Sequence, residues 1–169
     1  MTFDFKDFMN FINFQLFKQS NYEKSNSTTK IKIPISDEAK KLTSLLLKSQ
    51  TETDRQSLGD ELLDELADLA QIDIVNLKIS ETKQYHKKRN GKVAMKRYGY
   101  YKPGDKYIYI SNRTAVRGQI LAPKTFLDTL LHEWTHHYDY QKLGLNSIHS
   151  AGFYARLKDI KEKLGYFAY

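Results

Sequence analysis

The sequence predicts a single domain of the α+β class, and the spacing of its apolar residues supports this class. Apolar residues recur at helical spacing in the first 70 residues or so, alternate with polar residues between about Val75 and Ser111, and return to helical spacing from Pro123. The length of 169 residues is ordinary for one domain. We therefore expect N-terminal helices, a small and mostly antiparallel sheet, and a later helix.

The chain begins with a phenylalanine-rich stretch, MTFDFKDFMNFINFQLFKQ, which we expect to be helical. Asp4 and Asp7 lie where a signal peptide carries positive charge, so neither a signal peptide nor a membrane span is predicted. Its apolar surplus suits burial against the domain, and it also suits docking on a partner or covering an active site. The next stretch, QSNYEKSNSTTK, is typical of a linker. Residues 1–30 are thus expected to precede a main domain at 31–169.

Two helices are expected before the strands. Ser36 is suited to cap a helix that runs to about Lys48, and a second helix fits Leu58 to Gln71, with leucines spaced along one side. Each has a single apolar side, which predicts packing against the core.

The strands are expected between Val75 and Ser111. RNGK and Pro103-Gly104-Asp105 offer two turns, and KVAMKRYGYY and KYIYIS flank the second turn as a pair of strands. The strand Tyr107 to Ser111 has two interpretations: an internal strand, or an exposed edge that pairs with an extended peptide.

Charge is divided along the chain, which has a net charge of +7. Residues 52–73 carry eight acidic residues and one arginine, whereas residues 83–106 carry nine basic residues and one aspartate. The basic segment suits the phosphates of DNA or an acidic partner, and it equally suits a solvated hairpin face paired with the acidic helix. Its candidate nucleic-acid residues are Lys83, Lys87, Lys88, Arg89, Lys92, Lys96 and Arg97.

Four of the five histidines lie in LLHEWTHHYDYQKLGLNSIHSAGFY, residues 130–154. A helix from Pro123 places His132 and His136 one turn apart, opposite an apolar arc, as two imidazoles must lie to share a Zn²⁺ ion. Glu133 lies beside that face, where a carboxylate reaches water on a metal without becoming a ligand. Because the chain has no cysteine, a metal must use His, Asp or Glu.

Zinc also needs a third ligand, and His149 suits this role because Gly144 is placed to end the helix and a loop can turn the chain back. His137 points about 100° away from His136, which favours the core edge or solvent. Asp139 is on the ligand face one turn further on, so we expect it to hydrogen-bond a ligand imidazole. His86 is expected on the surface.

Together these residues resemble the SprT-like zinc metallopeptidases. The resemblance rests on MKRYGYY, YIYIS, LLHEWTHHYDY and HSAGFY, and it covers about Val75 to the end of the chain. It implies a minimal zincin fold in which a small sheet packs over the HExxH helix. It also implies that His132, His136 and His149 bind zinc and that Glu133 is the catalytic base. The chain departs from many relatives because it lacks their tryptophan, their Ser-Cys pair and a cysteine zinc ribbon.

The expected activity is zinc-assisted hydrolysis of peptide bonds in a protein substrate, with Glu133 moving a proton from water to the leaving amine. Tyr140 and Tyr154 are candidates to stabilise the oxyanion, because they lie near the ligands in sequence. Some SprT-like proteins act on proteins crosslinked to DNA, so a DNA-associated substrate is one expectation.

Three other interpretations stay open. They are a regulatory peptidase of the ImmA/IrrE type acting on a repressor, a non-catalytic zincin-fold module that binds nucleic acid or a partner, and a purely structural HExxH helix. The lack of cysteine suits a reducing, cytoplasmic location.

Overall fold

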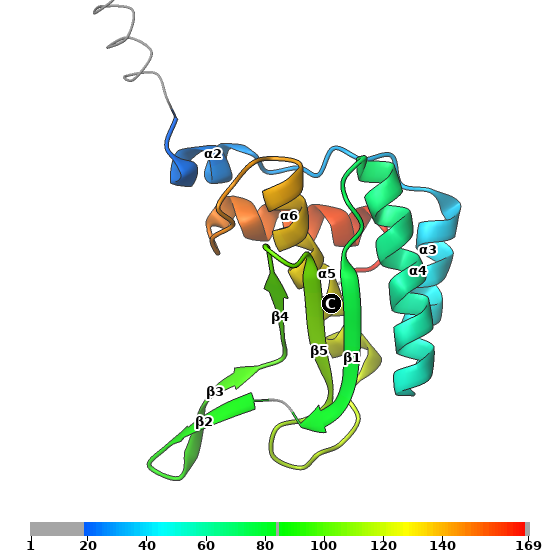
Figure 1. The fold of residues 1–169 in the computed structure, drawn as a ribbon, viewed down its shortest axis with the longest axis vertical. Helices are drawn as coiled ribbons and strands as arrows, with labels where there is room; N and C mark the ends of the chain where they lie inside the picture. Colours follow the sequence, from blue (N-terminus) through cyan, green and yellow to red (C-terminus); the bar gives the residue numbers. More distant parts are fainter. Residues whose placement is uncertain (1–18, 84, 168–169) are drawn as a thin grey trace, which may run out of the picture.

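The computed structural model describes residues 19–83 and 85–167, and these confirm the α+β class (Figure 1). The predicted phenylalanine-rich helix lies outside the described residues. The helices are α2 (Asn21–Ser27), α3 (Asp37–Leu46), α4 (Glu52–Ala70), α5 (Pro123–Gln141) and α6 (Ala151–Lys163). The strands are β1 (Asn76–Lys83), β2 (Tyr85–Arg89), β3 (Lys92–Arg97), β4 (Gly99–Lys102) and β5 (Tyr107–Arg113).

The main sheet has the strand order β1-β5-β4, and its pairing is mixed. β5 is antiparallel to β4 across the turn at residues 103–106 but parallel to β1, with Leu77 opposite Ile108 and Ile79 opposite Ile110. The prediction of a mostly antiparallel sheet is therefore wrong for the β1–β5 pair. The physical reason is that β5 inserts between β4 and β1, a long-range pairing that local patterning does not reveal.

Local sequence signals explain most of the element boundaries. Ser36 caps α3 as predicted, accepting a hydrogen bond from the Ala39 amide. α4 begins at Glu52 rather than at Leu58, because the Thr51 side chain caps it through the Asp54 amide. Asn90 and Gly91 both have positive φ, and they form the predicted turn of the β2–β3 hairpin.

The segment expected to be a linker is partly helical, and that expectation is wrong for residues 21–27. α2 has a capping box in which Ser20 and Glu23 satisfy each other's backbone amides. α2 also packs on α6, far away in sequence, so it belongs to the folded domain. The prediction failed because residues 21–27 have no apolar stripe that would indicate a packed helix. Their polar side chains instead hold α2 on the domain through hydrogen bonds.

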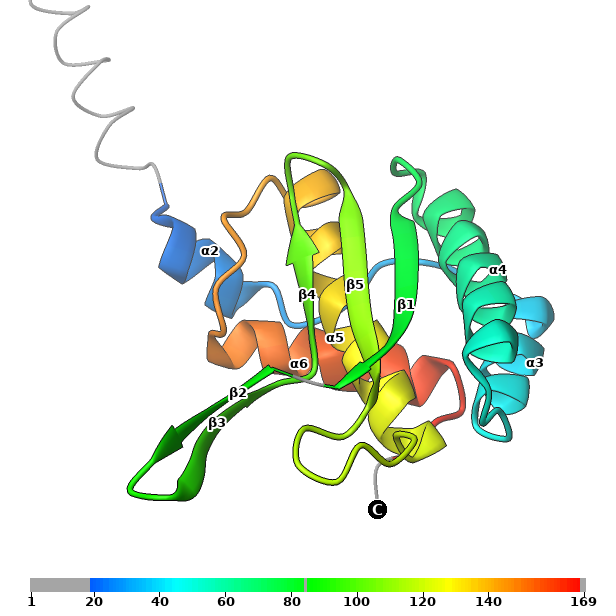
Figure 2. The ribbon, with the colours of Figure 1, turned by 60° about the horizontal axis from the view of Figure 1, so that its bottom comes forward.

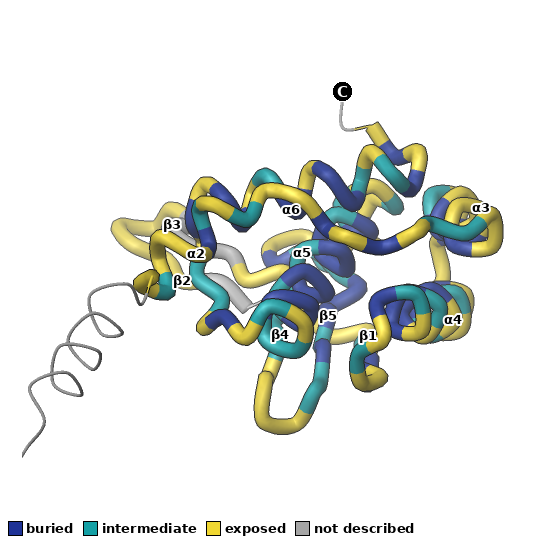
Figure 3. Tube along the Cα trace, turned by 90° about the horizontal axis from the view of Figure 1, so that it is seen from above, coloured by how far each residue is buried: buried dark blue, intermediate teal, exposed yellow. Residues whose placement is uncertain are grey.

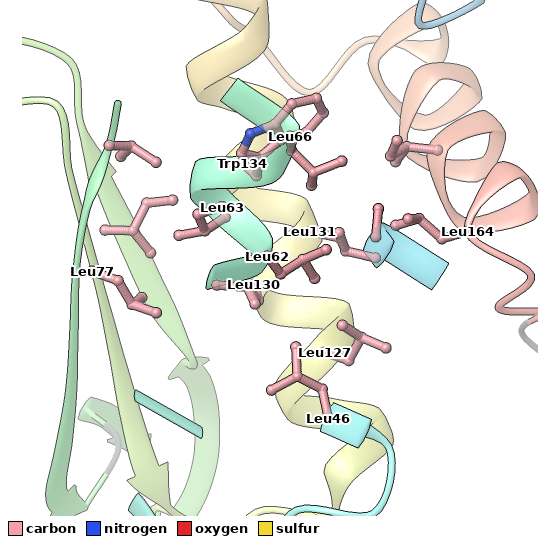
Figure 4. Close-up of a cluster of buried hydrophobic side chains, with 14 of the residues drawn as sticks. Leu46, Leu62, Leu63, Leu66, Leu77, Leu127, Leu130, Leu131, Trp134 and Leu164 are labelled. Atoms are coloured by element: carbon pink, nitrogen blue, oxygen red, sulfur yellow. The ribbon is translucent and has the colours of Figure 1, made fainter. Parts of the chain in front are cut away.

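The core lies around α5, which packs behind the sheet, while α4 lies beside β1 and α3 packs on α4 (Figures 1 and 2). Trp134 and three leucines of α5 meet α4, α3 and β1 (Figure 4). Burial is concentrated along α5 and the inner side of its neighbours (Figure 3). Burying such side chains contributes roughly 1.5–3 kcal/mol each, so α5 is held firmly in place.

Within the described ranges, no helix combines the length and the apolar character needed to cross a bilayer.

Candidate metal centre

Three histidine nitrogens converge beside α5. His132 and His136 lie one turn apart on this helix, and His149 comes from the loop that follows Gly144, whose φ of 60° turns the chain. The Nε2 atoms of His132 and His136 are 3.3 Å apart, and each lies 3.0 Å from Nε2 of His149. Within the described part of the chain, these three residues form the one group of His, Cys, Asp and Glu suited to a metal ion.

The spacing of these nitrogens fits a tetrahedral zinc ion. Zn–N bonds of about 2.0–2.1 Å separate two tetrahedral ligands by roughly 3.3 Å. A hydrogen bond needs one donor and one acceptor, and of three mutually close nitrogens at least two must have the same role. Those two repel each other unless a cation lies between them. The donor set therefore fits Zn²⁺ and leaves one tetrahedral position for another ligand.

A buried relay fixes the tautomer of His136. Arg156 donates to both carboxylate oxygens of Asp139, at 2.8 and 2.7 Å, and both side chains are fully buried. The Ser147 hydroxyl donates to Asp139 at 2.9 Å, so its oxygen accepts from Nδ1 of His136 at 2.8 Å. With the proton on Nδ1, the Nε2 lone pair of His136 is free for a metal. Asp139 thus reaches the imidazole through Ser147 rather than directly.

Phe153 forms an apolar wall against the three imidazoles. Its fully buried ring lies 5.0 Å from the ring of His132, 4.5 Å from that of His136 and 5.2 Å from that of His149. Burial lowers the pKa of His132 to about 4, with smaller contributions from His149 and Lys161, and lowers that of His136 to about 3, with smaller contributions from the other two imidazoles and Arg156. Both imidazoles are therefore neutral at pH 7, the form that binds metals.

Glu133 opens onto the same space but is not one of the grouped ligands. It is only 8% exposed, and burial raises its pKa to about 7, against the opposing effects of Arg97 and the Tyr101 amide. A carboxyl group with this pKa both accepts and returns protons near neutral pH.

His137 is separate from the histidine group, on the core side of α5. It is fully buried, its Nε2 donates to the Asp73 carbonyl at 2.7 Å, and its Nδ1 accepts from the Tyr101 hydroxyl at 2.9 Å. It therefore ties α5 to β4 and to the loop before β1. The side chain of His86 lies outside the described residues.

A cleft of about 970 Å³ runs past the histidines, between α5 and β4 on one side and the His149 loop and α6 on the other. Tyr140 and Tyr154 both line it. The Tyr140 hydroxyl donates to Asn146 at 2.7 Å, and the ring of Tyr154, 52% exposed, stacks on His149. Their role at an oxyanion stays a prediction.

The main sheet has two edge strands, β1, whose outer side is hydrogen-bonded by the Gln56 side chain, and β4, which borders the cleft. β5 has neighbours on both sides, so the interpretation of Tyr107 to Ser111 as an edge strand is wrong. β4 pairs only with β5 among the described strands, and its residues Gly99 to Tyr101 line the cleft.

The basic residues gather on the β2–β3 hairpin, which projects away from the body of the domain (Figure 2). Lys87, Lys88, Arg89 and Lys92, here called the basic hairpin, are exposed, and among the described side chains none of them forms an ion pair with α4. Lys83 and Arg97 are exposed at its base, and Arg97 also lines the cleft. The side chain of Lys96 is outside the described set.

Sequence reasoning missed two residues of this site, Ser147 and Arg156. Ser147 lies two positions before a predicted ligand in an otherwise irregular loop, which is a weak signal for an imidazole partner. Arg156 has no local signal, because its carboxylate partner is 17 residues away and its other partners lie near the start of the chain.

No family model, curated protein or solved structure matches this chain.

Proposed function

We propose that the chain is a zinc-dependent metallopeptidase, an endopeptidase of the SprT-like type that hydrolyses peptide bonds in protein substrates. The observation that supports this most is the triangle of His132, His136 and His149 nitrogens at 3.0–3.3 Å with the buried carboxyl group of Glu133 facing the same cleft. Histidine ligands, an adjacent general base and an open cleft together are the components of zinc-assisted hydrolysis.

A zinc ion bound by the three histidines supplies Lewis acidity, which acidifies water and polarises a carbonyl group. Glu133 performs the proton transfers in this proposal: its carboxylate oxygen takes a proton from the attacking water and returns it to the leaving amine. Burial raises the pKa of Glu133 to about 7 in the metal-free chain, and the charge of a bound zinc ion would lower it from there, which leaves a carboxylate that can accept the proton. The buried ring of Phe153 packs against the imidazoles and excludes water from that side of them, while the opposite side stays open to the cleft.

Strand β4 offers a way to align an extended substrate. The backbone amide of Tyr101 in β4 lies close enough to Glu133 to lower the pKa of this carboxyl group against the effect of burial, so the strand runs beside the proposed base. A peptide lying along this free edge would make main-chain hydrogen bonds and pass directly in front of Glu133. An extended segment of a protein is therefore the substrate class that the cleft suits.

Glu133→Gln is the test of the activity. We expect this variant to retain one zinc ion per chain and to lose cleavage of an unfolded test protein, because the amide keeps the shape but accepts no proton. Glu61→Gln, an exposed change on α4, is the matched control and should cleave normally. Unchanged cleavage by Glu133→Gln would remove Glu133 from the role of base.

His149→Ala tests the ligand set. We expect metal analysis to show zinc in the wild type and its loss after dialysis of the variant, because two nitrogens bind zinc far more weakly than three. Zinc retention equal to that of the wild type would show that His149 is not the third ligand.

A second candidate function is binding of nucleic acid, either to bring the peptidase to DNA-associated proteins or as the sole activity of a non-catalytic module. It is favoured by the exposed basic hairpin and by Tyr100, whose ring lies 4.5 Å from the Arg97 guanidinium and 5.7 Å from the Lys102 amine. Aromatic rings next to cations suit single-stranded nucleic acid.

We expect salt-dependent DNA binding that survives Glu133→Gln and weakens when Lys87, Lys88 and Arg89 are all changed to Gln. Binding that is unaffected by the triple change would contradict this role of the basic hairpin. A repressor substrate of the ImmA/IrrE type would share the site chemistry and differ only in the protein that is cleaved.

A further inference from the structure

The loop between α5 and α6, residues 142–150 and here called the ligand loop, carries two groups of the metal centre. Ser147 fixes the His136 tautomer, and His149 supplies the third nitrogen. From Gly144 to Ser150 the loop contains no regular secondary structure, and most of its side chains are not buried. An irregular loop of this kind can adopt many conformations, so contacts with the rest of the domain are needed to hold the one that places His149 beside His132 and His136.

One end of α2 binds the middle of the ligand loop. The Asn21 side chain makes two hydrogen bonds to the backbone of Asn146: its Nδ2 donates to the carbonyl at 2.8 Å, and its Oδ1 accepts from the amide at 2.8 Å. Lys24 donates to the carbonyl of Leu143. Asn146 is adjacent to Ser147, so this contact fixes the backbone on which the His136 partner sits.

The other end of α2 binds the point where the ligand loop enters α6. The hydroxyl groups of Ser25 and Ser150 lie 2.6 Å apart in a buried contact, and Asn26 accepts from the Gly152 amide at 3.0 Å. Ser150 follows His149 directly and caps α6. The approach is so close that a Cβ atom at Gly152 would overlap the Ser25 carbonyl.

Arg156 joins α2 to the relay behind His136. It donates to the Ser25 carbonyl at 2.7 Å and to the Thr28 carbonyl, while its other nitrogens bind Asp139. α2 therefore contacts the centre by three routes: through Asn146, through Ser150 and through the guanidinium that orients Asp139.

We propose that α2 is a positioning element of the metal centre, which holds the ligand loop in its metal-binding conformation from more than 100 residues away in the chain. The inference rests on the proposed zinc site and adds to it a dependence on residues 21–28. By fixing the loop in advance, α2 lowers the ordering cost of metal binding and slows the local opening that releases the ion. None of its residues is a ligand, so its effect is on retention of the metal.

The test uses the full chain with Asn21 and Asn26 both changed to Ala. We expect zinc to pass to a chromophoric chelator about tenfold faster than from the wild type, the range found when outer partners of metal ligands are removed. Asn21→Asp keeps the acceptor for the Asn146 amide but loses the donor, so its rate should be intermediate. Gly152→Ala, which pushes α2 outward, should also speed release.

Ser36→Ala is the control, because it removes the cap of α3 and lowers stability without touching α2 or the ligand loop. It should leave the zinc release rate unchanged. If the double variant releases zinc no faster than Ser36→Ala, α2 is an ordinary packing helix and the inference is overturned.

Hydrogen exchange on the metal-free chain separates this inference from the proposed function. We expect amides of the ligand loop to exchange faster in the double variant than in Ser36→Ala, because opening of the loop no longer costs the α2 contacts. A wild type that binds no zinc would refute the zinc site, and exchange would then decide the role of α2 alone. Unchanged exchange in the loop would refute that role.

Discussion

Arg55 and Arg156 are both completely buried, yet they lie in different surroundings. Arg55 in α4 donates to neutral acceptors: the Asn112 side chain at 2.6 Å and the carbonyls of Leu121 and Ser49 at 2.6 and 3.1 Å. Arg156 in α6 donates to the Asp139 carboxylate and to carbonyls of α2. Burial lowers the pKa of Arg55, and Glu81, which binds the far side of Asn112, works against that shift.

The difference shows that a buried arginine can stabilise the fold alone or can also support the site. Arg55 joins α4, β5 and the segment before α5, and none of its partners touches a histidine of the metal centre. The partners of Arg156 lead through Asp139 and Ser147 to His136. Arg55 is bound directly by neutral acceptors only, whereas Arg156 is bound by a carboxylate that leads through Ser147 to His136.

Arg156→Met should produce the largest effect. It leaves the Asp139 carboxylate buried without its cation, which costs about 3–5 kcal/mol of unfolding free energy. It also removes the two hydrogen bonds that orient Asp139, the partner of Ser147, and those to the α2 carbonyls, so zinc affinity should fall together with stability. Urea unfolding and zinc titration of the same sample measure both. A variant that loses stability but binds zinc as tightly as the wild type would separate Arg156 from the metal centre.

Arg55→Met should produce the next largest effect, and on stability alone. It leaves neutral buried acceptors unpaired, which costs roughly 2–3 kcal/mol. Zinc affinity should stay at the wild-type value under conditions where the variant is folded. Weaker zinc binding in the folded variant would contradict the separation of the two networks.

The sequence predicts a contact well when the two residues that make it are close together in the chain, and poorly when they are far apart. The proposed ligands His132 and His136 and the proposed base Glu133 share one helix, so helical periodicity alone places them together. Ser36 and the turn at Asn90-Gly91 are equally local, and both were predicted. The parallel β1–β5 pair and the α2 contacts join segments far apart, and no periodicity records such contacts. The resemblance to SprT-like peptidases stays a prediction.

Asp159 on α6 binds the segment before α3, through the Ile31 amide and Lys30, and this contact provides a pH test. Burial alone would raise its pKa, but hydrogen bonds from Lys163, the Ile31 amide and Lys30 together lower it below the ordinary 3.8. Since the folded-state pKa is depressed, the stabilisation is complete above the unfolded value and disappears as the pH falls through the folded value.

Asp159→Asn should therefore cost about 1.5 kcal/mol at pH 7, and the gap from the wild type should narrow on acidification below about pH 4. Urea unfolding at several pH values measures the gap, and Glu38→Gln on exposed α3 is the control. A gap that stays constant down to pH 2.5 would show that the Asp159 charge contributes nothing.

Ser147→Ala should have the smallest effect on stability and the most selective effect on the metal centre. Asp139 keeps both hydrogen bonds from Arg156, so unfolding should become easier by only about 1 kcal/mol. Nδ1 of His136 loses its acceptor, its tautomer is no longer fixed, and zinc affinity should fall about tenfold. Ser147→Thr retains the hydroxyl group and should restore affinity, which a purely steric role of Ser147 would not allow. Comparison with Arg55→Met then gives the two opposite cases: a large loss of stability with intact zinc binding, and a small loss with weakened zinc binding. Equal zinc affinity in Ser147→Ala and the wild type would show that the relay ends at Asp139 and that both buried arginines serve the fold alone.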